Sequence, residues 1–436
     1  MKPRGTGLTL FFVAYSAAWV ILLPVMLIYL MRRARKDPRY TRHLSERFGV
    51  VPAPLPGAVW IHAVSLGEFR SAVPLAQALL ARGEAVHITC LTPAGRAEAE
   101  TTLATEIATG RAVVTWLPLD MGWTCRRFLR AARPKAGLLM EMEFWPRLIE
   151  SADRLGVPLF ACNAQYPEKT FARDTRITRP LGQAMGLLAG AMVKSDLHKH
   201  RFAARGTAPL HVTGELRFDQ PVPDRLVQAG HALRARLGAT DRPVITIASA
   251  IAGEDDLLAG AIREIRARRP DTLVVYVPRA PERFDTVADI LQAADLKVLR
   301  RSAALGPDLA PRSALPGDVQ VLLGDSMGEM YAYLAMADRV IVGGGFVPKG
   351  AHNISEAFAL GKPVWVGEHI WTIAYPAQEA LAAGVLQILP ADPGAIATAL
   401  CAADGPTPAE VRDFFAAHQG ALGRTLAAFD SEMARR

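Results

Sequence analysis

Short apolar runs alternate with amphipathic stretches from residue 58 to residue 195. Six runs have the length and the content of small and β-branched residues that buried strands show. They are 58–64, 85–92, 112–120, 136–143, 157–165 and 186–195. Between them, 70–83 and 95–104 carry apolar residues at helical spacing. Strands that alternate with helices in this way are typical of a parallel sheet with crossover helices.

The same alternation resumes near residue 243. Predicted strands are 243–250, 272–279, 319–325, 339–345 and 363–368, and predicted helices are 253–269, 282–294, 327–337 and 352–361. Residues 218–243, between the two series, contain several prolines and few strand formers. The pattern predicts two α/β domains with a cleft between them, 32–220 and 221–406, followed by helices over 407–436. Ligands of such sheets bind beyond the carboxyl ends of the strands.

Residues 8–30 form an uncharged apolar segment of 23 residues. As a helix it would be roughly 34 Å long, enough to cross the ~30 Å hydrocarbon core of a bilayer. A cleaved signal peptide is the alternative, but its apolar region would be shorter and end in a small-residue cleavage site. Here the segment runs directly into a basic stretch. We therefore predict a membrane anchor over residues 1–31.

The charges that flank this segment predict its orientation. Only Lys2 and Arg4 precede it. The basic residues that follow are Arg32, Arg33, Arg35, Lys36, Arg39 and Arg42. By the positive-inside rule, residues 31–436 lie on the cytoplasmic face of the inner membrane. The same basic residues would face anionic lipid headgroups.

Composition narrows the possible partners. The 436 residues are 50% hydrophobic and 21% charged, which excludes a disordered chain. The net charge of +8 is concentrated near 32–47 and 126–135, so we expect no nucleic-acid partner. The four cysteines are widely spaced and form no C-x-x-C motif, so we predict neither a disulfide framework nor a metal site.

Two acidic segments follow predicted strands in the first domain. Glu68 comes after the strand of residues 58–64, on a predicted tight turn with Ser65 and Gly67 that opens a helix. A carboxylate there can serve as a general base, although an acid at a helix start is also favourable by itself. Glu141 and Glu143 are two positions apart at the end of an apolar strand, so we expect them to point the same way. Their alternative is an ordinary surface loop.

A glycine-rich segment in the second domain suggests a nucleotide or sugar-nucleotide site. Gly343, Gly344 and Gly345 follow a strand, and Lys349, His352, Asn353 and Glu356 lie around the next helix start. Backbone N–H groups of such a turn can approach a phosphate. Asn353 and Glu356 also have the spacing of a reciprocal helix cap.

Two smaller motifs accompany this segment. Arg279 ends a predicted strand and could balance phosphate charge, and a solvated arginine is its alternative. Ser326 and Glu329 have the spacing of a capping box, which we take as chiefly structural.

Taken in order, these motifs resemble the 3-deoxy-D-manno-octulosonic acid (Kdo) transferases of lipopolysaccharide biosynthesis. The shared features are the N-terminal apolar segment, ERFG (46–49), HAVSLGE (62–68), EMEFWP (141–146), PERF (281–284), GDSMGE (324–329) and the glycine cluster with HN (352–353). The resemblance implies a GT-B fold, CMP-Kdo as donor, the lipid A precursor lipid IVA as acceptor, and no metal or cofactor.

The resemblance also implies roles for single residues. Glu68 matches the catalytic base of an inverting transfer. The donor side comprises Arg279, Gly343, Gly344, Gly345, Lys349, His352, Asn353 and Glu356, with Glu356 suited to the ribose. Ser65, Gly67, Glu143 and Trp145 are assigned to the acceptor side or to a structural role.

The chain departs from the family pattern at several places. Ala250 and Ile251 replace a usual Thr-His pair, Ala280 replaces a histidine, and Gln165, Pro167, Glu215, Arg217 and Ala351 replace other usual residues. Three hypotheses therefore stay open: a Kdo transferase, a transferase of the same fold for another CMP-activated acidic sugar or lipid acceptor, and a non-catalytic membrane-bound paralogue.

Overall fold

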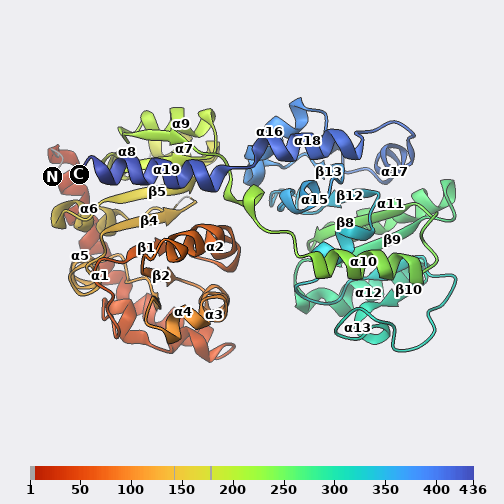
Figure 1. The fold of residues 1–436 in the computed structure, drawn as a ribbon, viewed down its shortest axis with the longest axis horizontal. Coiled ribbons are helices and arrows are strands. Elements are labelled where there is room, and N and C mark those ends of the chain that lie inside the picture. Colours follow the sequence, from red (N-terminus) through yellow and green to blue (C-terminus); the bar gives the residue numbers. More distant parts are fainter. Residues whose placement is uncertain (1–4, 142, 177–178) are drawn as a thin grey trace. The chain divides into compact units, whose positions relative to one another are not determined.

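The computed structural model describes residues 5–141, 143–176 and 179–436. Residues 1–4 of the predicted anchor, with Lys2 and Arg4, and residue 142 of the predicted strand 136–143 lie outside the described residues. The chain divides into two compact units, Met1–Gln220 with Gly420–Arg436 (unit 1) and Pro221–Gln419 (unit 2). Each unit is built on a sheet of seven strands (Figure 1).

All neighbouring strands of unit 1 are parallel, in the order β3-β2-β1-β4-β5-β6-β7. The strands are β1 (Val59–His62), β2 (Val86–Cys90), β3 (Ala112–Trp116), β4 (Ala136–Met140), β5 (Leu159–Ala164), β6 (Gly190–Val193) and β7 (Leu210–Val212). The α-helices are α1 (Thr6–Ala34), α2 (Leu66–Ala81), α3 (Pro93–Thr102), α4 (Ala104–Ala108), α5 (Gly122–Ala132), α6 (Pro146–Leu155), α7 (Glu168–Arg176), α8 (Arg179–Ala184), α9 (Asp196–Ala203) and α19 (Ala421–Ala434). The chain order reverses between β1 and β4, which makes this pair the switch point of the sheet.

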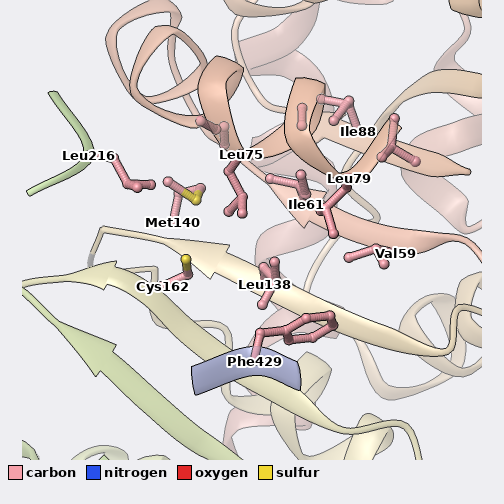
Figure 2. Close-up of a cluster of buried hydrophobic side chains, with 14 of the residues drawn as sticks. Val59, Ile61, Leu75, Leu79, Ile88, Leu138, Met140, Cys162, Leu216 and Phe429 are labelled. Atoms are coloured by element: carbon pink, nitrogen blue, oxygen red, sulfur yellow. The ribbon is translucent and has the colours of Figure 1, made fainter. Parts of the chain in front are cut away.

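The core of unit 1 lies between β1, β4 and the helices that cover them. Val59, Ile61 and Leu138 are fully buried in one apolar cluster (Figure 2). Phe429 of α19 joins the same cluster beside Leu138, and its ring packs edge-to-face with that of Phe160 in β5. The end of the chain thus completes the core of the first unit, which the sequence analysis did not predict.

Helix α1 carries the apolar segment and is the one helix of the described residues that is long and apolar enough to cross a membrane. Its most apolar 18-residue window has a mean hydropathy of 2.3, and 6% of that window is buried. Phe12 is buried, with the guanidinium of Arg147 over its ring. Further along the helix, Ile21 and Met31 expose large apolar side chains. Most of the helix surface therefore stays available to an apolar environment.

Unit 2 repeats the architecture, with parallel strands in the order β10-β11-β9-β8-β12-β13-β14. The strands are β8 (Val244–Ala250), β9 (Leu273–Pro278), β10 (Val298–Arg300), β11 (Val321–Leu323), β12 (Arg339–Val342), β13 (Val364–Gly367) and β14 (Leu386–Leu389). The α-helices are α10 (Asp224–Arg236), α11 (Asp255–Arg268), α12 (Phe284–Ala293), α13 (Arg301–Ala304), α14 (Met330–Met336), α15 (Ser355–Ala359), α16 (Ala374–Ala382), α17 (Pro393–Cys401) and α18 (Pro408–His418). Here the chain order reverses between β8 and β12.

The predicted class of parallel α/β sheets is confirmed in both units. Three edge strands, β7, β10 and β14, were not predicted from the sequence. They are three or four residues long and only partly buried, unlike the equally short but fully buried β11, so their sequences lack a clear apolar run. Helix α10 forms inside the proline-containing stretch 218–243, because Pro221, Pro223 and Pro243 all lie outside Asp224–Arg236 and leave the helix interior free.

Candidate functional site

The switch point of unit 1 brings two of the predicted acidic segments together. β1 pairs with β4 in parallel, with His62 opposite Leu139. The chain leaving β1 reaches Glu68 in the first turn of α2, and the chain leaving β4 reaches Glu143 just before α6. In open parallel sheets, ligands bind at this place. The arrangement therefore favours a site at the carboxyl ends of β1 and β4.

Glu68 is held by the start of α2. Ser65 is the N-cap residue, and its hydroxyl accepts a hydrogen bond from the Glu68 N–H at 3.4 Å. The carboxylate of Glu68 in turn accepts one from the N–H of Val64 at 2.7 Å. Burial raises the pKa of this carboxyl to about 7, while the Val64 hydrogen bond opposes the rise. A carboxyl with such a pKa is suited to proton transfer near neutral pH.

Gly67 does not form the predicted tight turn. It belongs to the first turn of α2, and no positive φ is found there. A Cβ added at Gly67 would meet no atom within 4 Å among the described residues. The glycine is therefore not required by the local backbone, and it leaves open space next to Glu68.

Glu143 and Trp145 lie against β1. An oxygen of the Glu143 carboxyl is 4.0 Å from Nε2 of His62, which is fully buried. The indole of Trp145 packs edge-to-face with the His62 ring at 6.3 Å. Burial, followed by the nearby charge of Glu68, raises the pKa of Glu143 to about 8. The structure thus places Glu68, Glu143 and Trp145 close together at the carboxyl ends of β1 and β4.

The expectation that Glu141 and Glu143 point the same way along a strand is wrong. β4 ends at Met140, and Glu141 has a left-handed φ of 58°, so the alternation of a strand stops there. The carboxylate of Glu141 pairs with Nζ of the buried Lys194 at 2.6 Å and accepts from the amide of Asn163 at 3.1 Å. It is not a surface-loop residue either, because it is 7% exposed.

The site also holds residues that the sequence analysis had not assigned to it. Lys194 bridges Glu141 and Glu215, with 2.6 Å to each carboxylate. Arg217, in the 3-10 helix η4 (Leu216–Asp219), donates to the hydroxyl of Ser71 at 2.8 Å. Its positive charge partly opposes the rise in the pKa of Glu68. Lysine next to the strand end of β6 was the available signal, since a charged residue there must be paired or bind a ligand.

The glycines of unit 2 lie at its own switch point, after β12. A Cβ on Gly343 would approach the Cα of Ala250 to 2.7 Å. Gly344 has a φ of +92°, and its Cβ would strike the carbonyl oxygen of Gly350. A Cβ on Gly345 would lie 2.9 Å from the backbone nitrogen of Gly367. Close approach of the backbones after β8, β12 and β13 therefore explains all three glycines.

Backbone N–H groups of this segment have partners inside the protein. Gly343 donates to the carbonyl of Ala248 at 2.9 Å. The buried carboxylate of Glu254 accepts from the N–H groups of Gly344 at 2.8 Å and Phe346 at 3.0 Å. The expected approach of these two glycine N–H groups to a phosphate is thus not available in this conformation. Glu254 was not singled out from the sequence.

Three predicted donor-side residues gather around the same loop. Arg279 follows β9, and its charge, after burial, lowers the pKa of His352 to about 4. The backbone N–H of His352 donates to the carbonyl of Gly343 at 3.0 Å. The exposed Lys349 reaches the carbonyl of Ala252 at 3.4 Å. A neutral imidazole between an arginine and a glycine loop can accept or donate a hydrogen bond to a ligand.

The two predicted helix caps are not formed. Asn353 accepts from the N–H of Ser355 at 3.1 Å, so it makes a local turn, while the N-cap residue of α15 is Ile354. Glu356 is half-buried on α15, where its charge contributes to the raised pKa of Tyr331, mainly a result of burial.

At α14, which begins at Met330, the hydroxyl of Ser326 binds the carboxylate of Glu329 instead of capping the helix. Arg301 also donates to Glu329 at 2.7 Å. That ion pair between distant segments replaces the local cap.

Solved structures of low sequence identity share the fold. UDP-GlcNAc 2-epimerase from Neisseria meningitidis is 14% identical, with a TM-score of 0.54, and the match covers 87% of this chain and 100% of that one. A glycosyltransferase from Rickettsia africae is 11% identical, with a TM-score of 0.52, over 87% of this chain and 96% of that one. The predicted GT-B-type architecture is thereby confirmed.

Sequence relatives are more specific. Residues 42–220 match the family described as 3-deoxy-D-manno-octulosonic-acid transferase (kdotransferase). The 3-deoxy-D-manno-octulosonic acid transferase of Bordetella pertussis is 39% identical over 95% of this chain and 98% of its own length. The same-named transferase of Haemophilus influenzae is 31% identical over 81% of this chain and 82% of its own length. The chain therefore belongs to the 3-deoxy-D-manno-octulosonic acid transferase family and is a glycosyltransferase.

Proposed function

We propose that this protein transfers Kdo from CMP-Kdo to the lipid A precursor lipid IVA with inversion at the anomeric carbon. The observation that carries the proposal is Glu68, a carboxyl with a pKa of about 7 at the switch point of unit 1. Its ionised form takes the proton from the attacking acceptor hydroxyl. The acceptor oxygen then bonds to the anomeric carbon, and the CMP phosphate leaves with the electrons of the broken bond.

Unit 2 is proposed to hold the donor. Charge builds up on the departing phosphate, and Arg279 and Lys349 supply positive charge near the loop after β12. His352 is neutral at physiological pH and offers a hydrogen bond without adding charge. Asn353 and Glu356 at the start of α15 are suited to the hydroxyls of the ribose. The three glycines are buried and let neighbouring backbones pack closely, which shapes the loop that is proposed to meet the donor.

The acceptor side is assigned to unit 1. The open space at Gly67 gives a sugar hydroxyl access to Glu68. Ser65 fixes the start of the helix that carries Glu68. Trp145, which is only partly buried, offers an apolar face to a sugar ring or lipid next to Glu143.

We further propose that α1 anchors the protein in the inner membrane, with both units on its cytoplasmic face. Exposed apolar residues such as Val20 and Ile21, and the basic Arg32 and Arg33 in the last turn, support this topology. A protease-sensitive tag on the N-terminus should be cleaved from the periplasmic side in spheroplasts. Cleavage only after the membrane is broken would contradict the spanning orientation.

The test of the transferase is CMP release by the detergent-solubilised full chain, given CMP-Kdo and lipid IVA. We expect release together with a product heavier by one or more Kdo units. Glu68→Gln, which keeps the shape and hydrogen bonds of the side chain, should lower the rate by about 10²–10⁴-fold. Product formation that Glu68→Gln leaves unchanged would contradict the assigned base.

A second candidate is a transfer of another CMP-activated acidic sugar, or a transfer to another lipid acceptor. It is favoured by Ala250, Ile251 and Ala280, which flank Arg279 in place of the residues usual in the family. Turnover of a different CMP-sugar, with none of CMP-Kdo, would support it. No turnover with any donor and an unchanged phenotype of Glu68→Ala in cells would support a non-catalytic role.

A further inference from the structure

The protonation state of His62 can be read from its surroundings. Nδ1 of this fully buried ring lies 3.0 Å from the backbone carbonyl oxygen of Thr89, its register partner on β2. A carbonyl oxygen can only accept a hydrogen bond, so we assign the proton to Nδ1. The Thr89 hydroxyl, 2.9 Å from the same nitrogen, already accepts from the indole N–H of Trp60 and can accept from Nδ1 as well. Burial lowers the pKa of His62 to about 4, so the ring is neutral at physiological pH. Its second nitrogen, Nε2, is therefore bare.

The bare Nε2 faces the site. It is buried and has no hydrogen-bond partner among the residues that the structure describes. The carboxyl group nearest to it is that of Glu143, with 4.0 Å from Nε2 to an oxygen. A carboxylate and a bare nitrogen are both acceptors and repel each other, whereas a protonated carboxyl can donate to the nitrogen. The two atoms are about 1 Å beyond the usual hydrogen-bond distance, so sharing the proton requires the Glu143 side chain to move toward His62.

The charges around Glu143 also favour the protonated form of its carboxyl. Among the described residues, its one ion-pair contact is to the neutral His62. Burial raises its pKa most, and the charges of Glu68 on α2 and Glu141 after β4 add to the rise, while the indole of Trp145 opposes it. Lys194 pairs with Glu141, and Arg217 lies 3.5 Å from Glu141 and also opposes the rise in the pKa of Glu68. The nearby cations are thus engaged with the other two carboxylates.

We propose that Glu143 is a protonated positioning residue, which shares its proton with Nε2 of His62 and stays neutral beside the ionised Glu68. The inference rests on the proposed role of Glu68 as the base. A second negative charge beside Glu68 would raise the pKa of Glu68 and leave it protonated at neutral pH. A neutral Glu143 avoids this cost. Glu68 accepts the N–H of Val64, which favours its ionised form, whereas Glu143 faces the bare Nε2 of His62, which favours its protonated form.

The test is the pH profile of kcat/KM for the full chain and for Glu143→Gln, whose amide imitates the protonated acid. We expect the pH profile of Glu143→Gln to keep the acid limb of the wild type, near pH 7. The wild type should lose activity above about pH 8 as Glu143 ionises, and the variant should lack this alkaline limb. Glu84→Gln, a surface carboxyl of unit 1 paired with Lys135, is the matched control and should leave both limbs unchanged.

Two results would overturn the proposal. If Glu143 is ionised before Glu68, its replacement by glutamine removes a charge and moves the acid limb to lower pH by about one unit. If the carboxylate itself is required, Glu143→Gln loses activity as fully as Glu68→Gln. Full activity of Glu68→Gln would instead remove the proposed base, and the two failures are therefore distinguishable.

A readout on the wild-type protein does not depend on catalysis. In the nitrogen NMR spectrum of the protein labelled at histidine, His62 should show a protonated Nδ1 and a bare Nε2. The spectrum of His62→Gln, which lacks these signals, assigns them. The opposite tautomer, or a doubly protonated ring, would overturn the proposal even if Glu143→Gln failed to fold.

Discussion

The carboxylate of Glu254 accepts a hydrogen bond from the backbone N–H of Gly344 at 2.8 Å. The same carboxylate binds the N–H groups of Ile251 and Phe346 at 3.0 Å each. One buried acid therefore joins the loop after β8 to the loop after β12, at the switch point of unit 2. Because the N–H groups converge on it, Glu254 shapes the loop that is proposed to meet the donor.

Glu254→Gln should destabilise unit 2 by about 2–4 kcal/mol, because an amide replaces the charged acceptor of several buried N–H groups. Urea unfolding followed by circular dichroism measures the loss. Glu264→Gln, an exposed carboxyl on α11, is the matched control and should change stability by less than about 0.5 kcal/mol. Equal stability of the two variants would contradict the structural role of Glu254.

The activity should depend on the ionisation of Glu68. Only the carboxylate can accept the proton, so kcat/KM should fall as pH drops below about 7, by about tenfold per unit. The measurement is kcat/KM from about pH 4 to about 8.5 at constant ionic strength. An acid limb near pH 4.5, the ordinary value for glutamate, would show that burial does not act on Glu68 as described.

Ionised Glu68 should lower the free energy of unfolding of the protein at high pH. Its pKa is raised from 4.5 in the unfolded chain to about 7 in the fold, so folding favours the protonated form. The stabilisation is fully present below about pH 4.5 and is lost as pH rises through about 7. Glu68→Gln should therefore exceed the wild type in stability by up to about 3 kcal/mol at pH 8, and the difference should vanish on acidification. Urea unfolding of the wild type and of Glu68→Gln, at pH 8 and at about pH 4.5, tests the sign of this stability difference.

The sequence determined most of the fold because its signals were local. The strands that carry the sites, β1, β4, β8 and β12, are buried on both faces and read as continuous apolar runs. Edge strands such as β7 are partly exposed and short, so the apolar run that would reveal them is missing. The return of α19 to unit 1 depends on contacts such as Phe160 with Phe429, which no local pattern contains.

The residues of the candidate site also divide into those with a local sequence signal and those explained only by distant contacts. Glu68 was found because strand, cap and acid are contiguous in the sequence. Lys194 and Glu215 were missed because each is explained only by the other and by Glu141, over fifty residues from Lys194 in the chain. The capping box at Ser326 was mispredicted for a related reason. Its glutamate is taken by Arg301, which lies on another helix.

Gly67 offers a test of acceptor access. Gly67→Ala adds a methyl group that meets no atom within 4 Å among the described residues, and alanine suits a helix better than glycine. The variant should be as stable as the wild type or more so, by about 0.5–1 kcal/mol. If the acceptor hydroxyl approaches Glu68 through this space, KM for the lipid acceptor should rise. An unchanged KM in the stable variant would move the approach elsewhere.

Arg279 offers a test of the donor side with two independent readouts. Arg279→Ala should weaken CMP binding by about 10–100-fold, the worth of one charged hydrogen bond to phosphate. It should also raise the pKa of His352, because the Arg279 charge contributes to holding that pKa near 4. Calorimetry with CMP and histidine NMR measure the two effects. Arg236→Ala, an exposed arginine on α10, removes the same charge from unit 2 at a distance from the loop. If both variants bind CMP equally well but only Arg279→Ala shifts His352, then Arg279 lies beside the histidine without contacting the phosphate.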